Sequence, residues 1–154
     1  VIGRQARNIA SDEVFDYIAG YTIVNDLTAR DLQRTHKQWF VGKSLDGFAP
    51  MGPVIVSRDE IPDPGALRLS TYVDGELRQE AHTSLMIFDV PYVVSFLSRM
   101  LTLQVGDIIA MGTPEGVGIG FDPPRLLKDG STVDVRIEGI GRLTTTLRFA
   151  STAS

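Results

Sequence analysis

The sequence predicts a β-rich α+β fold, a mixed β-sandwich or β-roll built from antiparallel sheets. Strand-like segments outnumber helical ones, and they do not alternate with helices in the regular order that a parallel sheet requires. Two pairs of strands are typical of hairpins: residues 67–73 and 76–81 flank Asp74-Gly75, which suits a type I′ turn, and residues 132–138 and 142–149 flank a Gly-Ile-Gly turn. The 154 residues, 43% of them hydrophobic, suffice for a single domain with one core.

The first third of the chain predicts two short helices around one strand. A Ser-Asp-Glu run at residues 11–13 precedes helically spaced apolar residues and predicts a capped helix that Gly20 ends. Residues 21–24 mix aromatic, Thr and β-branched side chains and predict a strand, and residues 27–34 predict the second helix. Residues 35–53 have no clean period, so we expect a long loop, and such loops in compact domains are often functional.

The rest of the chain predicts further strands and one longer helix. Residues 54–57 predict a short buried strand, and residues 108–111 predict another. Between them, apolar residues at helical spacing predict an amphipathic helix over residues 89–101. Residues 112–120 are rich in glycine and form either a mobile surface loop or a loose phosphate cradle. Three large side chains also follow the helical spacing, and we assign them to core packing rather than to a binding surface: Tyr92, Phe96 and Met100.

Composition and charge exclude several classes of function. The formal net charge is −4, which leaves no broad basic face for a nucleic-acid backbone. The chain has no cysteine, which excludes disulfides and thiolate metal sites. It has no apolar run near the roughly 18 residues that span a membrane, so a cytoplasmic protein is the default expectation. The opening Val1-Ile2 is typical of the end of a strand, and we expect residues 1–154 to form one domain that lacks an N-terminal segment.

Asp26 is the best candidate for a metal ligand. It follows a predicted strand, which would hold it rigidly, and Mg²⁺ and Mn²⁺ prefer carboxylate oxygens. The alternative is an ordinary cap for the helix over residues 27–34. Arg30 and Gln33 share a face of that helix, where Arg30 could bind a carboxylate and Gln33 could donate to a carbonyl or enolate oxygen. A solvated helix surface is the alternative for this pair.

Lys43 is a further candidate because Trp39 and Phe40 lie in the same segment. Apolar neighbours would desolvate its charge, which suits proton transfer or stabilisation of an oxyanion. The alternative is an ordinary surface lysine. The Gly-Lys-Ser run at residues 42–44 is not a P-loop, since Lys37 occupies a position where that motif needs glycine. The two histidines of the chain show no metal-ligand spacing.

A series of motifs runs along nearly the whole chain: Asn25-Asp26-Leu27-Thr28-Ala29-Arg30-Asp31-Leu32-Gln33, Gly42-Lys43-Ser44, Pro50-Met51-Gly52-Pro53, Asp74-Gly75-Glu76 with Gln79, Gly112-Thr113-Pro114-Glu115-Gly116-Val117-Gly118, and Glu138-Gly139-Ile140-Gly141. In this order the motifs resemble the fumarylacetoacetate hydrolase family. Each motif alone is weak, whereas the ordered set is specific.

The resemblance implies a mixed β-sandwich or β-roll, a homodimer and a Mg²⁺ or Mn²⁺ site. It implies 2-oxo acids or their enols as substrates and a metal-bound enolate as intermediate. The reaction would be C–C bond hydrolysis of acylpyruvates, decarboxylation of oxaloacetate-like acids or isomerisation of 2-hydroxymuconate-type diacids. Asp26 matches the family's metal-binding aspartate, and Arg30, Gln33 and Lys43 match positions that contact the substrate. A further motif matches the loop that holds the substrate carboxylate: Gly112, Thr113 and Pro114.

The sequence departs from the family pattern in one respect. The family's two other metal carboxylates form a Glu-x-Glu pair that would precede Val1, as would a lid that brings a histidine and an acid for activating water. We therefore expect the intact protein to be an enzyme and residues 1–154 alone to be inactive. The alternatives are a catalytically inactive member that binds a small dicarboxylate or serves as a dimerising scaffold, and an unrelated small β-barrel binding domain.

Overall fold

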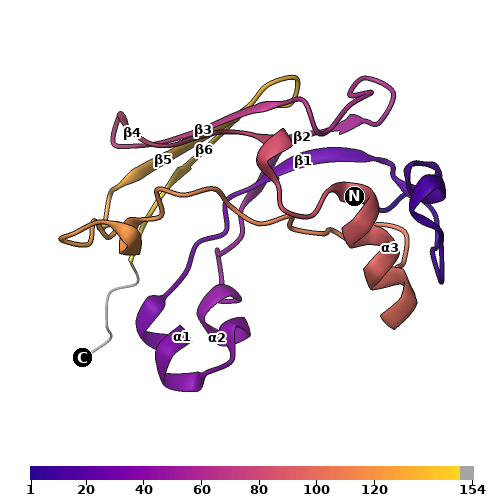
Figure 1. Cartoon of the computed structure of the whole chain (residues 1–154). Helices are drawn as coiled ribbons and strands as arrows, with labels where there is room; N and C mark the ends of the chain where they lie inside the picture. The colour runs from indigo at the N-terminus through magenta and orange to yellow at the C-terminus, as the bar shows by residue number, and fades with distance from the viewer. Residues whose placement is uncertain (150–154) are drawn as a thin grey trace.

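The computed structural model, which describes residues 1–149, contains two antiparallel sheets and confirms the predicted α+β class (Figure 1). In the smaller sheet, β1 (Gly20–Val24) pairs with β2 (Met51–Ser57). The larger sheet has the strand order β4-β3-β5-β6, so a strand near the end of the chain pairs with one from its middle. Its strands are β3 (Arg68–Val73), β4 (Glu76–His82), β5 (Thr132–Ile137) and β6 (Gly141–Thr146).

Both predicted hairpins are confirmed. Asp74 and Gly75 have φ angles of 51° and 83°, the left-handed pair that a type I′ turn requires. The strands that they join, β3 and β4, pair in register apart from an irregularity between Thr71 and Tyr72. The second hairpin joins β5 to β6 through Gly139, whose φ of 75° lies where glycine is favoured. Local turn chemistry thus predicts the pairing of all four strands within their hairpins.

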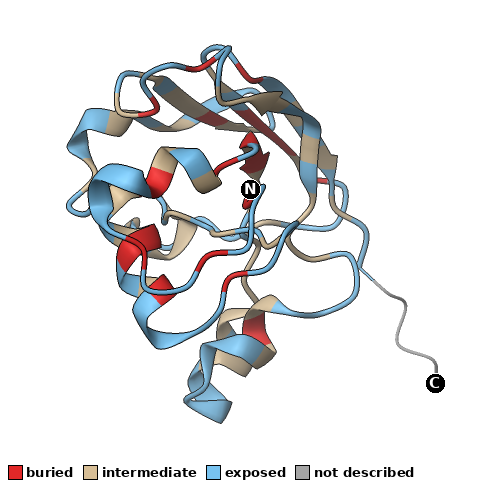
Figure 2. Ribbon diagram, turned by 90° about the vertical axis from the view of Figure 1, so that its right-hand side faces the viewer, coloured by how far each residue is buried: buried red, intermediate tan, exposed pale blue. Residues whose placement is uncertain are grey.

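The four-stranded sheet has one apolar face and one polar face. Val133 and Val135 of β5 are 3% and 7% exposed and pack in a cluster with Ile23 of β1. Asp134 lies between them and points to the opposite face, because successive strand side chains alternate. Figure 2 shows buried positions on both strands and helices. A second cluster of buried residues comes from the N-terminal segment, helix α3 and the residues after it: Ile2, Ala6, Ile9, Val14, Ile18, Val90, Val94 and Leu103. The buried residues thus form two clusters rather than the single core expected.

The helices differ from the predictions in their bounds. The first is a 3₁₀ helix, η1 (Ser11–Tyr17), and the second, α1 (Arg30–His36), begins later than predicted. A short helix, α2 (Trp39–Lys43), lies inside the predicted loop; it packs against α1, and the pair projects from the sheets (Figure 1). Two further 3₁₀ turns occur, η2 (Thr83–Leu85) and η3 (Gly118–Gly120). Within residues 1–149, none of the helices is long and apolar enough to cross a bilayer.

Two strand predictions need correction. Residues 54–57 are confirmed as part of strand β2 but not as a buried strand, since Val54 and Ile55 are 52% and 58% exposed. A short apolar run does not by itself say whether another layer covers it. Residues 108–111 lie in no strand of the described chain. The residue just before this segment is instead bonded to the N-terminal part of the chain: the Ile2 amide donates to the Asp107 carbonyl at 2.9 Å.

Helix α3 (Val90–Met100) confirms the predicted helix and corrects its orientation. Its core face follows a four-residue spacing: Val90, Val94 and Ser98. Tyr92, Phe96 and Met100 follow the same spacing but are 47%, 41% and 64% exposed, so their assignment to the core is wrong. Positions two residues apart differ by about 200° around a helix. The spacing therefore identifies a stripe, whereas the packing decides which stripe faces the core.

The exposed stripe of α3 forms an aromatic stack. The ring centroids of Phe88 and Tyr92 are 4.7 Å apart, and those of Tyr92 and Phe96 are 6.3 Å apart, with nearly parallel planes in both pairs. The guanidinium of Arg99 lies 5.7 Å from the Phe96 ring centroid. These contacts give the outward side chains partners on the helix surface itself.

Candidate functional site

A cavity of about 1100 Å³ lies on the apolar face of the four-stranded sheet. Its floor is made by inward-facing strand residues: Leu69, Thr71, Val73, Val133 and Val135. One wall comes from residues 24–31 and 43–48 and the other from the segments around residues 112–119 and 125–127, and residues 145–149 also line the cavity. Six of the seven candidate residues line this one cavity: Asp26, Arg30, Lys43, Gly112, Thr113 and Pro114. The fold thus brings together two motifs that are far apart in the sequence.

Asp26 and Lys43 form an ion pair on the first wall. Asp26 lies two residues after the end of β1, and its Oδ2 accepts a hydrogen bond from Lys43 Nζ at the end of α2. The side chain of Asp26 remains 43% exposed and that of Lys43 27% exposed. Asp26 does not cap α1, because the residue before that helix is Ala29 and no side chain caps it. Its carboxylate is therefore available to the cavity.

The close packing of α2 on α1 places Lys43 beside Asp26. The Ala29 amide donates to the Gly42 carbonyl at 2.8 Å. A Cβ added at Gly42 would lie only 2.9 Å from the Ala29 carbonyl oxygen and 3.0 Å from Gln33 Cβ. Only glycine allows this approach without displacement. The glycine of the Gly-Lys-Ser run therefore has a packing role, in keeping with the rejection of a P-loop.

Lys43 does not have the apolar surroundings that the sequence predicts. Trp39 and Phe40 are 67% and 76% exposed, so these aromatic side chains turn to solvent and do not cover the ammonium group. The neighbour of its charge is instead the Asp26 carboxylate.

Arg30 and Gln33 meet on one face of α1, as their spacing predicts. Arg30 Nη1 donates to Gln33 Oε1 at 2.9 Å. Arg30 lines the cavity, whereas Gln33 is not among its lining residues. Gln33 Nε2 is buried and has no hydrogen-bond partner among the described residues. Gln33 therefore supports the guanidinium of Arg30, and its amide nitrogen keeps an unused donor.

The second wall is tied to β4 by one side chain. Gln79 Nε2 donates to Thr113 Oγ1 at 2.8 Å and to the Pro114 carbonyl at 2.9 Å. The backbone at Gly116 lies so close to β4 that an added Cβ would be 1.9 Å from the Arg78 carbonyl oxygen. These contacts argue against a mobile surface loop at this end of residues 112–120. Sequence reasoning assigns no role to Gln79 or Arg78, although both line the cavity.

The described residues do not complete a metal site. No group of three or more His, Cys, Asp or Glu side chains within residues 1–149 is placed to hold an ion. Asp26 supplies one carboxylate, and Lys43 already neutralises it. Neither His36 nor His82 is among the residues that line the cavity. Because Mg²⁺ needs near-octahedral oxygen coordination, we derive no chemical step through a metal from these residues.

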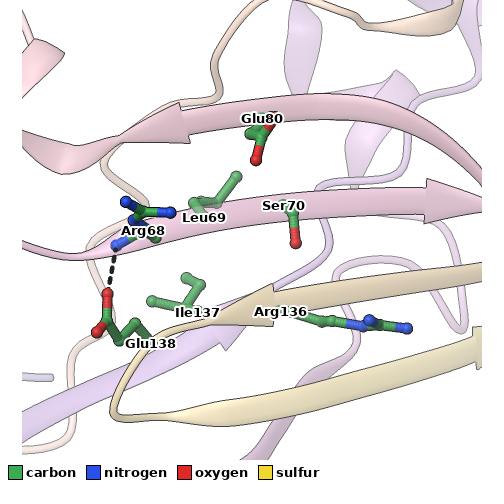
Figure 3. A pocket seen from close by; sticks show the side chains of 7 residues that line it. All are labelled: Arg68, Leu69, Ser70, Glu80, Arg136, Ile137 and Glu138. Atoms are coloured by element: carbon green, nitrogen blue, oxygen red, sulfur yellow. Dashed lines mark hydrogen bonds between the residues drawn. The ribbon is translucent and has the colours of Figure 1, made fainter.

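A second, smaller depression of about 560 Å³ lies at the ends of β3, β4 and β5 (Figure 3). Its charged side chains are balanced in number: Arg68, Arg136, Glu80 and Glu138. The backbone amide of Arg68 donates to Glu138 Oε2 at 3.4 Å. None of the candidate residues lines this smaller depression, so the larger cavity remains the candidate site.

The fold and the cavity together define a class of protein: an α+β domain with a polar-walled, apolar-floored cavity on one face of its larger sheet. The sequence model described as fumarylacetoacetate (FAA) hydrolase C-terminal matches residues 1–148. The chain therefore belongs to the fumarylacetoacetate hydrolase family, as its motifs predict.

Similar proteins include enzymes of more than one kind. The chain is 52% identical to the oxaloacetate tautomerase YisK of Bacillus subtilis over 143 residues, which cover 93% of this chain and 48% of that protein. The structure matches a fumarylacetoacetate hydrolase from Exiguobacterium antarcticum with a TM-score of 0.94 and 49% identity, covering 96% of this chain and 53% of the other. It also matches a 2-hydroxyhepta-2,4-diene-1,7-dioate isomerase from Mycobacterium marinum with a TM-score of 0.87 and 45% identity, covering 96% and 55%.

The chain spans about half the length of the curated relatives that it matches. The cavity walls described above therefore represent the part of a site that residues 1–149 contribute.

Proposed function

We propose that the full-length protein is an enzyme that interconverts the keto and enol forms of a small 2-oxo acid, with oxaloacetate as the first substrate to test. The support comes from two sources. One is the 52% identity to an oxaloacetate tautomerase over almost the whole chain. The other is the cavity, in which the Lys43 ammonium, the Arg30 guanidinium and the Thr113 hydroxyl line the same space as the Asp26 carboxylate.

Each polar group would act on a different part of the substrate. Thr113 Oγ1 would donate a hydrogen bond to the C1 carboxylate, with Gly112 and Pro114 shaping the backbone around it. Lys43 Nζ would donate to the C2 oxygen, where negative charge develops when the C3 proton leaves. Arg30, held by Gln33, would attract a carboxylate with its guanidinium. Preorganised donors at a developing oxyanion are commonly the largest single contribution to catalysis.

Tautomerisation demands the least of the described residues. Keto–enol interconversion needs a stabilised enolate and proton transfer, whereas hydrolysis of an acylpyruvate also needs an activated water. Neither histidine of the chain is among the residues that line the cavity, so the described part supplies no histidine for that purpose. Mg²⁺ or Mn²⁺ remains the proposed cofactor, with Asp26 as its ligand from this part of the chain.

The test is an activity assay of the full-length protein with oxaloacetate, following the decay of the ultraviolet absorbance of the enol. It is run with Mg²⁺, with Mn²⁺ and with a chelator, beside parallel assays for acylpyruvate hydrolysis and oxaloacetate decarboxylation. Lys43→Met should lower kcat/KM for tautomerisation by about 100-fold. Lys128→Met is the matched control, because Lys128 is exposed and does not line the cavity. If the protein hydrolyses an acylpyruvate but does not turn over oxaloacetate, the proposed tautomerase activity is wrong and hydrolysis takes its place.

A further inference from the structure

Gln79 projects into the cavity from β4. In the antiparallel pairing it lies opposite Thr71 of β3, and side chains of directly paired residues share one face of a sheet. Thr71 is a floor residue of the cavity, and Gln79 lines the same space. Gln79 is half-buried, and its amide has hydrogen-bond partners within the protein.

The partners of Gln79 determine which way its amide faces. A Gln side chain offers two donor hydrogens on nitrogen and acceptor sites on oxygen. The Pro114 carbonyl can only accept a hydrogen bond, so the atom that faces it at 2.9 Å must be the amide nitrogen. The same nitrogen lies 2.8 Å from Thr113 Oγ1. Both hydrogens of Nε2 are therefore used, one on each partner, and a flipped amide would place two acceptors against each other.

The direction of this bond in turn determines the role of the Thr113 hydroxyl. Because Thr113 Oγ1 accepts from Gln79, its own hydrogen points away from the amide. Within residues 1–149 the hydroxyl has no other hydrogen-bond partner. Thr113 lines the cavity, so the free hydrogen is available to an acceptor there. A carboxylate only accepts hydrogen bonds, which makes it the natural partner of a hydroxyl held in this way.

We propose that Gln79 is a positioning residue that orients the Thr113 hydroxyl as a hydrogen-bond donor to the substrate carboxylate. The inference rests on the proposed function, since it assumes a carboxylate ligand in this cavity. Gln79 does not hold the loop alone, because the close approach of Gly116 to β4 is a second, independent contact. Its removal should therefore alter the hydroxyl and leave the path of the loop in place.

Two substitutions separate orientation from packing. Gln79→Glu keeps the size of the side chain but accepts the Thr113 hydrogen instead of donating to its oxygen, and it adds a negative charge facing the ligand. Gln79→Met keeps the approximate length and removes both donors. We expect Gln79→Met to weaken binding of a 2-oxo acid about tenfold and Gln79→Glu about 100-fold. In the turnover assay the loss should appear in KM, with kcat changed much less.

A double-mutant comparison tests whether Gln79 acts through Thr113. Thr113→Val removes the hydroxyl, so Gln79→Met should add little further loss in the Thr113→Val background, whereas independent effects would multiply. Thr113→Ser, which keeps the hydroxyl, should retain sensitivity to Gln79→Met. Gln104→Met is the matched control, since Gln104 bonds Gln5 and does not line the cavity. All variants are made in the full-length protein.

The outcomes for the two proposals are distinct when binding and turnover are both measured. Calorimetry with oxaloacetate and pyruvate gives affinity without requiring catalysis. Binding without tautomerisation would overturn the proposed function. The affinities of the Gln79 variants would then still test the positioning role. Equal losses from Gln79→Met in both backgrounds, or unchanged affinity in Gln79→Glu, would overturn the positioning role. Wild-type protein that binds neither acid would overturn both proposals.

Discussion

Asp26 and Asp134 both pair with cationic side chains, yet they lie in opposite surroundings. Asp134, on the polar face of the four-stranded sheet, is 8% exposed and accepts hydrogen bonds from Arg136 at 3.0 Å, from Thr144 at 2.8 Å and from Arg142. Asp26 is 43% exposed and has Lys43 as its ion-pair partner. A carboxylate offers about four acceptor sites, so Asp134 is nearly saturated within the protein, whereas Asp26 keeps sites free.

The difference separates a structural carboxylate from one that can bind a ligand. Burial by itself would raise the pKa of Asp134, but hydrogen bonds from Arg142, Thr144 and Arg136 outweigh it and lower that pKa from 3.8 to about 2. The ionised form of Asp134 is thus built into the folded state. Asp26 lies on a cavity wall with the Lys43 ammonium group beside it. We therefore expect changes at Asp26 to affect activity and changes at Asp134 to affect stability.

The largest expected effect is on activity at Asp26. Asp26→Asn should lower kcat/KM for the 2-oxo acid by about 100-fold or more, because it removes the one carboxylate paired with Lys43 in the cavity. The free energy of unfolding should change by less than about 1 kcal/mol, since partly exposed ion pairs contribute little. Affinity for Mg²⁺ or Mn²⁺ should fall in the same variant. Asp59→Asn, at a side chain 86% exposed, is the control. Full activity in Asp26→Asn would contradict a role for this carboxylate.

The next effect is on stability at Asp134. Asp134→Asn should lower the free energy of unfolding by about 2–3 kcal/mol, because it weakens three hydrogen bonds to a buried charge. The value lies at the low end for a buried pair since the Arg136 and Arg142 side chains are 47% and 58% exposed and can reach water. Urea unfolding of the wild type and of Asp134→Asn measures this change in the free energy of unfolding. If Asp134→Asn lowers the free energy of unfolding no more than the Asp59→Asn control does, Asp134 contributes no more to stability than an exposed charge.

The pH dependence of stability should also report on Asp134. The pKa of Asp134 is lower in the folded state than its ordinary value of 3.8, so the unfolded chain takes up a proton first as the pH falls. The stabilisation from Asp134 is therefore complete above about pH 4 and is lost progressively as the pH falls toward about 2. Unfolding measured across this range should show a steeper loss in the wild type than in Asp134→Asn. Parallel profiles would contradict this assignment.

The smallest expected effect concerns the packing that positions Lys43. Gly42→Ala introduces a Cβ 2.9 Å from the Ala29 carbonyl oxygen, which should push α2 away from α1 and move Lys43 from Asp26. We expect kcat/KM to fall about tenfold, because small displacements of catalytic groups are costly. Gly120→Ala is the control, since its Cβ would meet only Val117 Cγ2, at 3.8 Å. Unchanged kcat/KM would show that the contact between the two helices does not set the position of Lys43.

Local features of the sequence predicted much of the fold. Asp74-Gly75 specifies its turn because few residue pairs tolerate two positive φ angles, and helix α3 follows from its apolar spacing. The side chains of that helix illustrate the limit, since the exposed Tyr92 and the buried Val94 belong to stripes with the same period. Helix α2 is too short to have a clear period of its own. It depends on contact with α1, which a local pattern does not reveal.

The candidate site divides in the same way. Asp26, Arg30 and Lys43 lie within one short stretch, so the sequence alone indicates a common wall. Helix spacing groups Gln33 with Arg30, but the structure places Gln33 behind Arg30 rather than on the cavity surface. The link from Gln79 to Thr113 joins residues separated by 34 positions, and no turn or period in the sequence predicts it.

The sequence by itself determined the family, the hairpins and the identity of most candidate side chains, because these depend on residue type and on near neighbours. Only the tertiary structure decided which stripe of α3 is buried, that Lys43 faces a carboxylate instead of aromatic rings, and that Gln79 holds Thr113. The physical reason is that burial and hydrogen-bond direction depend on contacts between distant segments. Such contacts exist only when β3 pairs with both β4 and β5 and the cavity walls meet across the resulting sheet.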